Sequence, residues 1–200
     1  MTIYLLRHAS TEHNDPGTEG GERFRGWSNG PLSEKGVAEA KESAAALKKH
    51  PPTAIYSSDL QRSKETAQVI SDELGGIKVQ SLPELRTWNI GKFTNQLVSK
   101  YGPEVTRYQQ TPNKNVPGGE AYGQFYRRFK GAWERLSKDK GDPLLVLHGR
   151  QLWSLPSILT NGKLPIPFEG PPNPSDILAF DNGSLDFHYK NKSGRQTRTG

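Results

Sequence analysis

The chain has no cysteine among its 200 residues. This absence excludes structural disulfides, thiolate metal sites and cysteine nucleophiles, and it fits a reducing compartment. Long hydrophobic runs are also missing: no stretch approaches the roughly 20 apolar residues of a membrane span, and the N-terminal apolar run is too short for a signal peptide. We therefore expect a cytoplasmic protein with no membrane partner, of a size that suits one domain with its own core.

Most of the chain also lacks an excess of positive charge, although the net charge of the whole chain is +6. Four of the 27 basic residues lie within residues 190–200, where there is no acidic residue, so the remaining 23 face 21 acidic residues. The body of the protein is therefore nearly neutral. We interpret residues 190–200 as a flexible basic tail and expect no nucleic-acid partner.

Short apolar runs alternate with amphipathic helical patterns along most of the chain. The runs that predict strands are residues 2–6, 53–58, 77–82 and 143–149. The patterns that predict helices are residues 33–49, 59–74, 120–138 and a stretch that begins near Arg150. Residues 176–180 and 184–189 flank Asn182-Gly183, a strong hairpin signal.

This alternation predicts an α/β fold: a three-layer sandwich with a mostly parallel central sheet, helices on both faces and an antiparallel C-terminal edge hairpin. A single domain would span residues 1–189, and the polar segment of about 93–117 would be an insertion beside the sheet. Ser33 and Asp59 are expected to cap the helices that follow them. Gly36 should destabilise a first helical turn, and Arg127-Arg128 should lie on a solvated helix face.

Polar side chains follow three of the predicted strands. Arg7 and His8 end the first strand, Arg62 lies on the first turn of the helix after the second, and His148 ends the fourth. Because the carboxyl ends of parallel strands meet at one rim of a sheet, these side chains should converge. Two arginines and two histidines would form a cationic pocket suited to a phosphate dianion, whose oxygens guanidinium groups match in pairs.

His8 is the candidate nucleophile, because the chain has neither cysteine nor a serine in a Gly-x-Ser-x-Gly turn. Nearby arginines should keep its imidazole neutral, so that a ring nitrogen can attack phosphorus. His148 would contact the transferring phosphoryl oxygens. Metal binding is the rival use of two histidines, but it needs further carboxylate or imidazole ligands, and the arginines would repel a cation, so we expect no metal.

Five stretches of the chain carry these residues and their neighbours. They are LLRHASTEHN (5–14), RFRGWSNGPLSEKG (23–36), SSDLQRSKETA (57–67), PGGEAYGQFYRRF (117–129) and LLVLHGRQLW (144–153). In this order, and over nearly the whole chain, they resemble the histidine phosphatase superfamily, also called phosphoglycerate-mutase-like.

The resemblance implies that His8 becomes phosphorylated and that neither a metal nor an organic cofactor takes part. The positions that match the phosphate pocket of the family are Arg7, Arg62 and His148. The positions that match its further polar and substrate contacts are Thr11, Asn14, Arg25 and Gly26. By the same likeness, residues of about 93–117 would partly cover the pocket.

The chain departs from the family pattern at three positions. Ala9 replaces the glycine after the Arg-His pair, and Ala121 replaces the serine after Gly-Gly-Glu. Thr87 stands where relatives carry the glutamate that serves as general acid and base. Threonine cannot exchange that proton near pH 7, and Glu84 would reach the pocket only if the loop differed from that of the family.

These observations predict a phosphoric monoester hydrolase that acts on small phosphorylated metabolites through a phosphohistidine. Without the general acid it would favour good leaving groups or turn over slowly. Two alternatives remain: a mutase of the phosphoglycerate-mutase type, and a phosphate-binding pseudoenzyme that has lost the acid. The natural substrate and the oligomeric state do not follow from the sequence.

Overall fold

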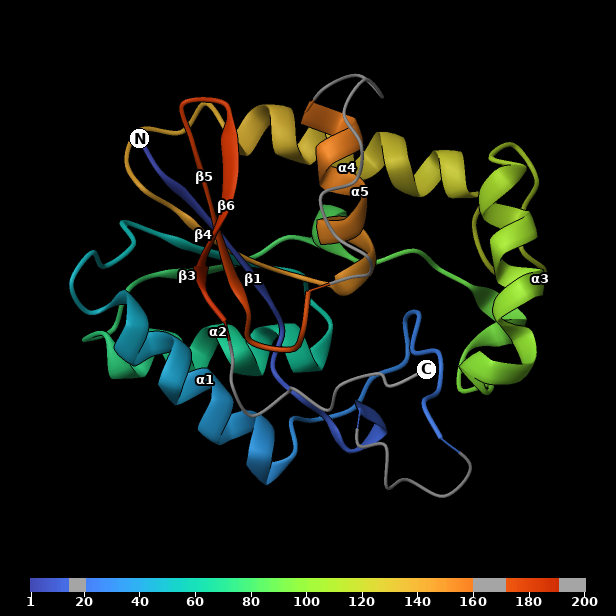
Figure 1. Cartoon of the computed structure of the whole chain (residues 1–200), viewed down its shortest axis with the longest axis horizontal. Helices are drawn as coiled ribbons and strands as arrows, with labels where there is room; N and C mark the ends of the chain where they lie inside the picture. Colours follow the sequence, from blue (N-terminus) through green and yellow to red (C-terminus); the bar gives the residue numbers. More distant parts are fainter. Residues whose placement is uncertain (15–20, 160–171, 191–200) are drawn as a thin grey trace.

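The computed structural model describes residues 1–14, 21–159 and 172–190, and Figure 1 shows their arrangement. A six-stranded sheet runs through the centre in the order β3-β2-β4-β1-β5-β6. Its strands are β1 (Ile3–Arg7), β2 (Ile55–Ser57), β3 (Val79–Ser81), β4 (Leu144–Leu147), β5 (Ile177–Asp181) and β6 (Ser184–Tyr189). The first four strands are parallel, and β5 and β6 form an antiparallel hairpin at one edge, as the sequence predicts.

Helices cover both faces of the sheet. In Figure 1, α1 (Glu34–Leu47) and α2 (Gln61–Glu73) lie below the strands, whereas α4 (Tyr122–Leu136) and α5 (Gly149–Leu159) lie above them. Alternating side chains of β1 explain both layers, because successive residues of a strand point to opposite faces. Ile3 and Leu5 pack in the core under α4 and α5, and Tyr4 and Leu6 pack in the core against α1 and α2. The predicted three-layer α/β sandwich is confirmed.

The segment predicted as an insertion contains the end of a short 3₁₀ helix, η3 (Gly91–Phe93), and the helix α3 (Val98–Gln110). Figure 1 shows α3 beyond one end of α4, away from the strands. Two further 3₁₀ turns, η1 (Glu12–Asn14) and η2 (Pro83–Leu85), lie in loops. The predicted basic tail falls almost wholly outside the described residues, and none of the described helices is long and apolar enough to cross a membrane.

Two of the local predictions for the helices need correction. Ser33 caps α1 as expected, since its Oγ accepts a hydrogen bond from the Gly36 amide at 3.1 Å. Asp59 does not cap α2: its carboxylate instead binds Arg86 through two hydrogen bonds of 2.7 and 2.5 Å, and α2 begins after Leu60 without a side-chain cap. Gly36 is required rather than merely tolerated, because a Cβ there would lie 1.9 Å from the Ser10 carbonyl oxygen.

Candidate active site

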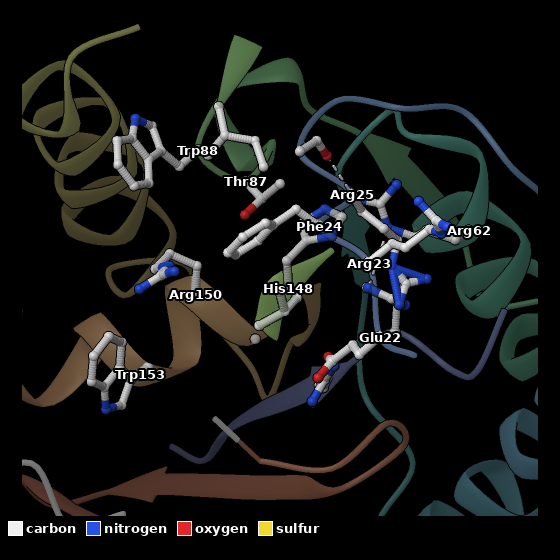
Figure 2. Close-up of a pocket in the computed structure, with 16 residues that line it drawn as sticks. Glu22, Arg23, Phe24, Arg25, Arg62, Thr87, Trp88, His148, Arg150 and Trp153 are labelled. Carbon is white, nitrogen blue, oxygen red and sulfur yellow. Dashed lines mark hydrogen bonds between the residues drawn. The ribbon is translucent and has the colours of Figure 1, made fainter. Parts of the chain in front are cut away.

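A cavity of about 360 Å³ opens at the carboxyl ends of the parallel strands (Figure 2). The positively charged and imidazole side chains that line it are Arg7, His8, Arg23, Arg25, Arg62, His148 and Arg150. The four residues predicted from the strand ends, Arg7, His8, Arg62 and His148, are therefore brought together. Their meeting follows from the strand order, because β1 and β4 are direct neighbours and β2 lies on the other side of β4.

The hydrogen bonds of His8 define its tautomer. Its Nδ1 lies 2.9 Å from the carbonyl oxygen of Ala9, which can only accept, so Nδ1 carries the proton. The Nε of Arg62 donates to Nε2 of His8 at 3.2 Å, so Nε2 presents a lone pair. Burial, followed by the charge of Arg62, holds the pKa of His8 well below its usual 6.5. The imidazole is therefore neutral near pH 7, and Nε2 is its unprotonated nitrogen.

His148 faces His8 with the two ring centroids 5.0 Å apart. Its Nε2 forms a hydrogen bond with the Ser58 hydroxyl at 2.8 Å, whereas its Nδ1 is buried and has no partner among the described residues. Burial and the charge of Arg62 also keep the pKa of His148 well below 6.5. A buried polar atom without a partner costs free energy, so Nδ1 of His148 could gain a hydrogen bond from a ligand or water that enters beside His8.

Arg62 anchors the loop that forms one wall. It is 2% exposed, and its guanidinium donates to the carbonyls of Ser28 at 2.8 Å and Gly26 at 3.0 Å. Burial and Arg7 lower its pKa to about 10. Gly26 has φ +47°, and a Cβ there would lie 2.7 Å from the Ile90 side chain. Gly26 thus lines the cavity through its backbone.

Arg25 extends the cluster of arginines. Burial, followed by the charges of Arg62 and Arg7, lowers its pKa to about 9. Its guanidinium donates to the hydroxyl of Thr11. Thr11, predicted as a substrate contact, is not among the residues that line this cavity; together with Arg25 it lines a smaller neighbouring one. Asn14 belongs to η1, but its side chain lies outside the described part of the chain.

Thr87 lies on the cavity wall, 8% exposed. The Trp27 indole donates to its carbonyl at 2.7 Å. Glu84 does not reach the cavity, because its carboxylate binds Arg135 at 2.5 Å. Among the described residues that line the cavity, the one carboxylic acid is Glu22, which is exposed and which the sequence reasoning missed.

Arg128 corrects the expectation of a solvated helix face. Its guanidinium donates to the carbonyls of Glu84, Arg86 and Thr87 at 3.0, 2.8 and 3.3 Å, and it binds the Glu120 carboxylate at 2.7 Å. It thus clamps the loop that carries Thr87. The sequence did contain a sign that Arg128 is not on the solvated face: it lies three residues after the buried Phe125 on α4 and therefore on the same face of the helix.

Apolar side chains also line the cavity. They are Phe24, Trp88, Ile90, Val98 and Trp153. Trp88 packs edge-on against Tyr122, with centroids 5.1 Å apart, and both Trp88 and Trp153 line the cavity. The described residues contain no group of three or more His, Asp or Glu side chains that could hold a metal ion.

Comparison with known proteins places these residues in context. Residues 3–182 match the family model described as histidine phosphatase superfamily (branch 1). The chain is also 33% identical over 166 residues to the probable phosphoglycerate mutase GpmB of Yersinia pestis, a match that covers 80% of this chain and 74% of the relative.

Two solved structures share the fold of this chain. A mycobacterial glucosyl-3-phosphoglycerate phosphatase in complex with VO3 superposes with a TM-score of 0.71 at 23% identity, covering 93% of this chain and 95% of that one. A phosphoglycerate mutase from Thermus thermophilus superposes with a TM-score of 0.67 at 27% identity, covering 90% of this chain and 93% of that one.

Proposed function

Because the chain belongs to the histidine phosphatase superfamily, we propose that it is a phosphoric monoester hydrolase that acts on small phosphorylated compounds. The observation that carries the proposal is the state of His8: neutral, with Nδ1 bonded to a carbonyl and Nε2 presenting a lone pair beside Arg62. A nucleophilic nitrogen held among arginines is suited to attack on a phosphoryl group, whose charge the arginines neutralise.

The reaction would run in two displacements. In the first, Nε2 of His8 loses its hydrogen bond from Nε of Arg62 and bonds to phosphorus as the bond to the leaving oxygen breaks. The growing positive charge on the ring strengthens the Nδ1–H hydrogen bond to the Ala9 carbonyl. In the second, water bonds to phosphorus, the bond to Nε2 breaks, and the proton lost from the water passes to solvent. Arg7, Arg62 and the Nδ1 position of His148 would hold the phosphoryl oxygens in both steps.

The leaving group must depart without a buried carboxylic acid. Thr87 occupies the wall, Glu84 is paired with Arg135, and Glu22 is exposed. General acid help is typically worth about 10²- to 10⁴-fold in rate. We therefore propose a preference for phosphoanhydrides, acyl phosphates or aryl phosphates over plain alkyl esters. The rate across a series of aryl phosphates should fall steeply as the pKa of the leaving group rises; a flat dependence would show that an effective acid exists.

Turnover of a chromogenic aryl phosphate by His8→Ala tests the nucleophile. We expect less than about 1% of the wild-type rate, because loss of a covalent nucleophile removes the reaction path. His50→Ala, which replaces an exposed histidine after α1, is the matched control and should retain full activity. Rapid quenching of the wild type should trap a phosphoryl adduct that is labile to acid and stable to alkali. An undiminished rate in His8→Ala would refute the proposal.

Two other functions have a specific observation in their favour. The 33% identical relative bears the name of a probable phosphoglycerate mutase, which favours phosphoryl transfer between two positions of a bound phosphoglycerate. The threonine at position 87 favours a pseudoenzyme that binds phosphate compounds without turnover. Interconversion of phosphoglycerate isomers without release of phosphate would identify the mutase. Tight binding of a phosphorylated ligand without turnover of any substrate would identify the pseudoenzyme.

A further inference from the structure

Glu39 is a buried carboxylate that the two proposed displacements leave without a role. It lies on the inward face of α1 and is 2% exposed. Burial of a carboxylate costs free energy unless cations or N–H donors bind it. One cation is Lys35, a turn earlier on α1, whose Nζ lies 4.0 Å from Oε1 of Glu39. One N–H donor comes from outside the helix, and it belongs to the loop that follows His8.

That donor is the backbone amide of Ser10, which donates to Oε2 of Glu39 at 2.9 Å. The same peptide group carries the carbonyl of Ala9, whose oxygen accepts from Nδ1 of His8 at 2.9 Å. All four of these residues are buried, which keeps bulk water away from both hydrogen bonds. A single peptide group therefore joins the carboxylate of Glu39 to the imidazole of His8.

Hydrogen bonds at the two ends of one peptide group strengthen each other. An amide N–H that donates to an anion shifts electron density toward its own carbonyl oxygen, which becomes a better acceptor. The carboxylate of Glu39 thus makes the Ala9 carbonyl oxygen more negative at the point where the Nδ1 proton of His8 meets it. A better acceptor for Nδ1–H raises the basicity of the other ring nitrogen, as it does for imidazoles that bind metals. In His8 that other nitrogen is Nε2.

We propose that Glu39 is a positioning residue that makes His8 a stronger nucleophile through the Ala9–Ser10 peptide group. As Nε2 bonds to phosphorus and the leaving oxygen departs with its electron pair, the ring becomes positively charged. The polarised Ala9 carbonyl stabilises this charge, and the proton stays on Nδ1 throughout. When the bond between phosphorus and Nε2 later breaks, its electron pair returns to the ring. This inference rests on the proposed function for the phosphoryl transfer itself.

Glu39→Gln removes the charge and keeps an oxygen that can accept from the Ser10 amide. Rapid quenching with an aryl phosphate measures formation of the phosphohistidine, and a single-turnover experiment measures its decay. We expect formation to slow by about three- to tenfold, because a hydrogen bond to a charged acceptor is stronger than one to a neutral acceptor. Decay should become faster, because the positively charged ring of the adduct loses stabilisation. Glu39→Asp, which keeps the charge but withdraws it by one methylene group, should give intermediate rates.

Two control variants separate this role from simple anchoring of the loop. Thr66→Val removes the hydroxyl that accepts from the Ala9 amide at 3.1 Å, an N–H of the preceding peptide group. A looser loop would slow both steps or neither, so Thr66→Val should not change the two rates in opposite directions. Glu42→Gln removes an exposed carboxylate from the same helix and should leave both rates unchanged. Any result for Glu39→Gln other than slower formation with faster decay would overturn the proposal.

Proton NMR of the free protein separates this inference from the hydrolase proposal. The buried, hydrogen-bonded Nδ1 proton of His8 should give a downfield ring N–H resonance that is lost in His8→Asn. In Glu39→Gln the resonance should move upfield, because a weaker acceptor binds the proton, and it should move less in Thr66→Val. Such a shift would support the role of Glu39 even if the wild type hydrolysed no phosphate ester. Turnover that requires His8, with a shift in Glu39→Gln no larger than in Thr66→Val, would retain the hydrolase and refute the inference.

Discussion

A substitution at Thr87 should change the chemistry of this cavity more directly than a substitution elsewhere on its wall. Its side chain lies on the wall, while its carbonyl is held by the indole of Trp27 and the guanidinium of Arg128. Both contacts use the backbone, so a different side chain at position 87 would leave the loop anchored. A carboxylic acid can therefore be introduced at position 87, on a cavity wall whose described residues include no buried acid.

Thr87→Glu should therefore raise the rate for substrates with poor leaving groups. We expect a gain of at least about tenfold on an alkyl phosphate and a shallower dependence on leaving-group pKa across aryl phosphates, because a carboxylic acid can protonate the departing oxygen. Thr87→Gln has the same shape without the proton and is the matched control. Equal rates in the two variants would show that position 87 does not face the leaving group.

Some side chains of the cavity could be placed from the sequence, and others could not. Arg7, His8 and His148 could be placed because each ends a strand, and strand ends have a known position in a parallel sheet. Arg150 was not predicted, although it occupies on α5 the same second helical position that Arg62 occupies on α2. The partner of Thr11 could not be predicted, because a loop takes its orientation from packing that no local pattern encodes. Thr11 thus matched a substrate position in the motif but supports Arg25 in the structure.

At the scale of elements, α1 is fixed to the loop after β1 by close backbone contact. The Ser33 amide donates to the Ser10 carbonyl at 3.1 Å, and the same carbonyl oxygen lies against Gly36. The sequence indicated only the propensity cost of glycine in a helix. The sequence did not indicate that the Ser10 carbonyl lies against Gly36, because this contact joins residues that belong to different elements.

A pair of glycine substitutions tests this contact. Gly36→Ala should lower the free energy of unfolding by at least about 2 kcal/mol, since its Cβ would overlap the Ser10 carbonyl. Gly131→Ala, at an exposed position of α4 with open space around the added Cβ, should instead raise it by about 0.5–1 kcal/mol. Urea unfolding measures both. Stabilisation by Gly36→Ala would mean that α1 and the loop are not in contact.

The helix α4 holds the loop of residues 84–88 through Arg128. Arg128→Gln would remove the side-chain donor of the Glu84 and Arg86 carbonyls and the cationic partner of the Glu120 carboxylate. We expect a loss of about 1–3 kcal/mol in the free energy of unfolding. Arg127→Gln, one position along on the exposed face, should change it by less than about 0.5 kcal/mol. Urea unfolding measures both variants, and similar losses in the free energy of unfolding would mean that Arg128 does not hold this loop.

At the scale of the whole molecule, the strand order accounts for both the fold and the site. β1 and β4 are buried neighbours in the sheet and deliver His8 and His148 to the same rim. The alternation of strands and helices along the chain predicted this much. The strand ends also predicted a cationic pocket around the two imidazoles. They did not predict that Arg23 and Arg150 line the same cavity, because neither residue follows the end of a strand directly.

Burial of the two imidazoles, and after it the charge of the arginines, should make the stability of the whole protein depend on pH. The pKa values of His8 and His148 are lowered by folding, so the unfolded chain binds protons more readily than the native state once the pH falls below about 6.5. Each histidine then removes up to about 1.4 kcal/mol of stability per pH unit, until its own lowered pKa is reached.

Between pH 7.5 and 5.5, in buffer without phosphate, the wild type should therefore lose more stability than a variant with His8→Asn and His148→Asn, by up to about 2.7 kcal/mol. Urea unfolding at the two pH values measures the difference, and carboxyl groups common to both proteins cancel. Phosphate is left out because an anion bound among the arginines would stabilise the native state by itself. An equal loss in the two proteins would mean that the imidazoles are already accessible to protons in the native state.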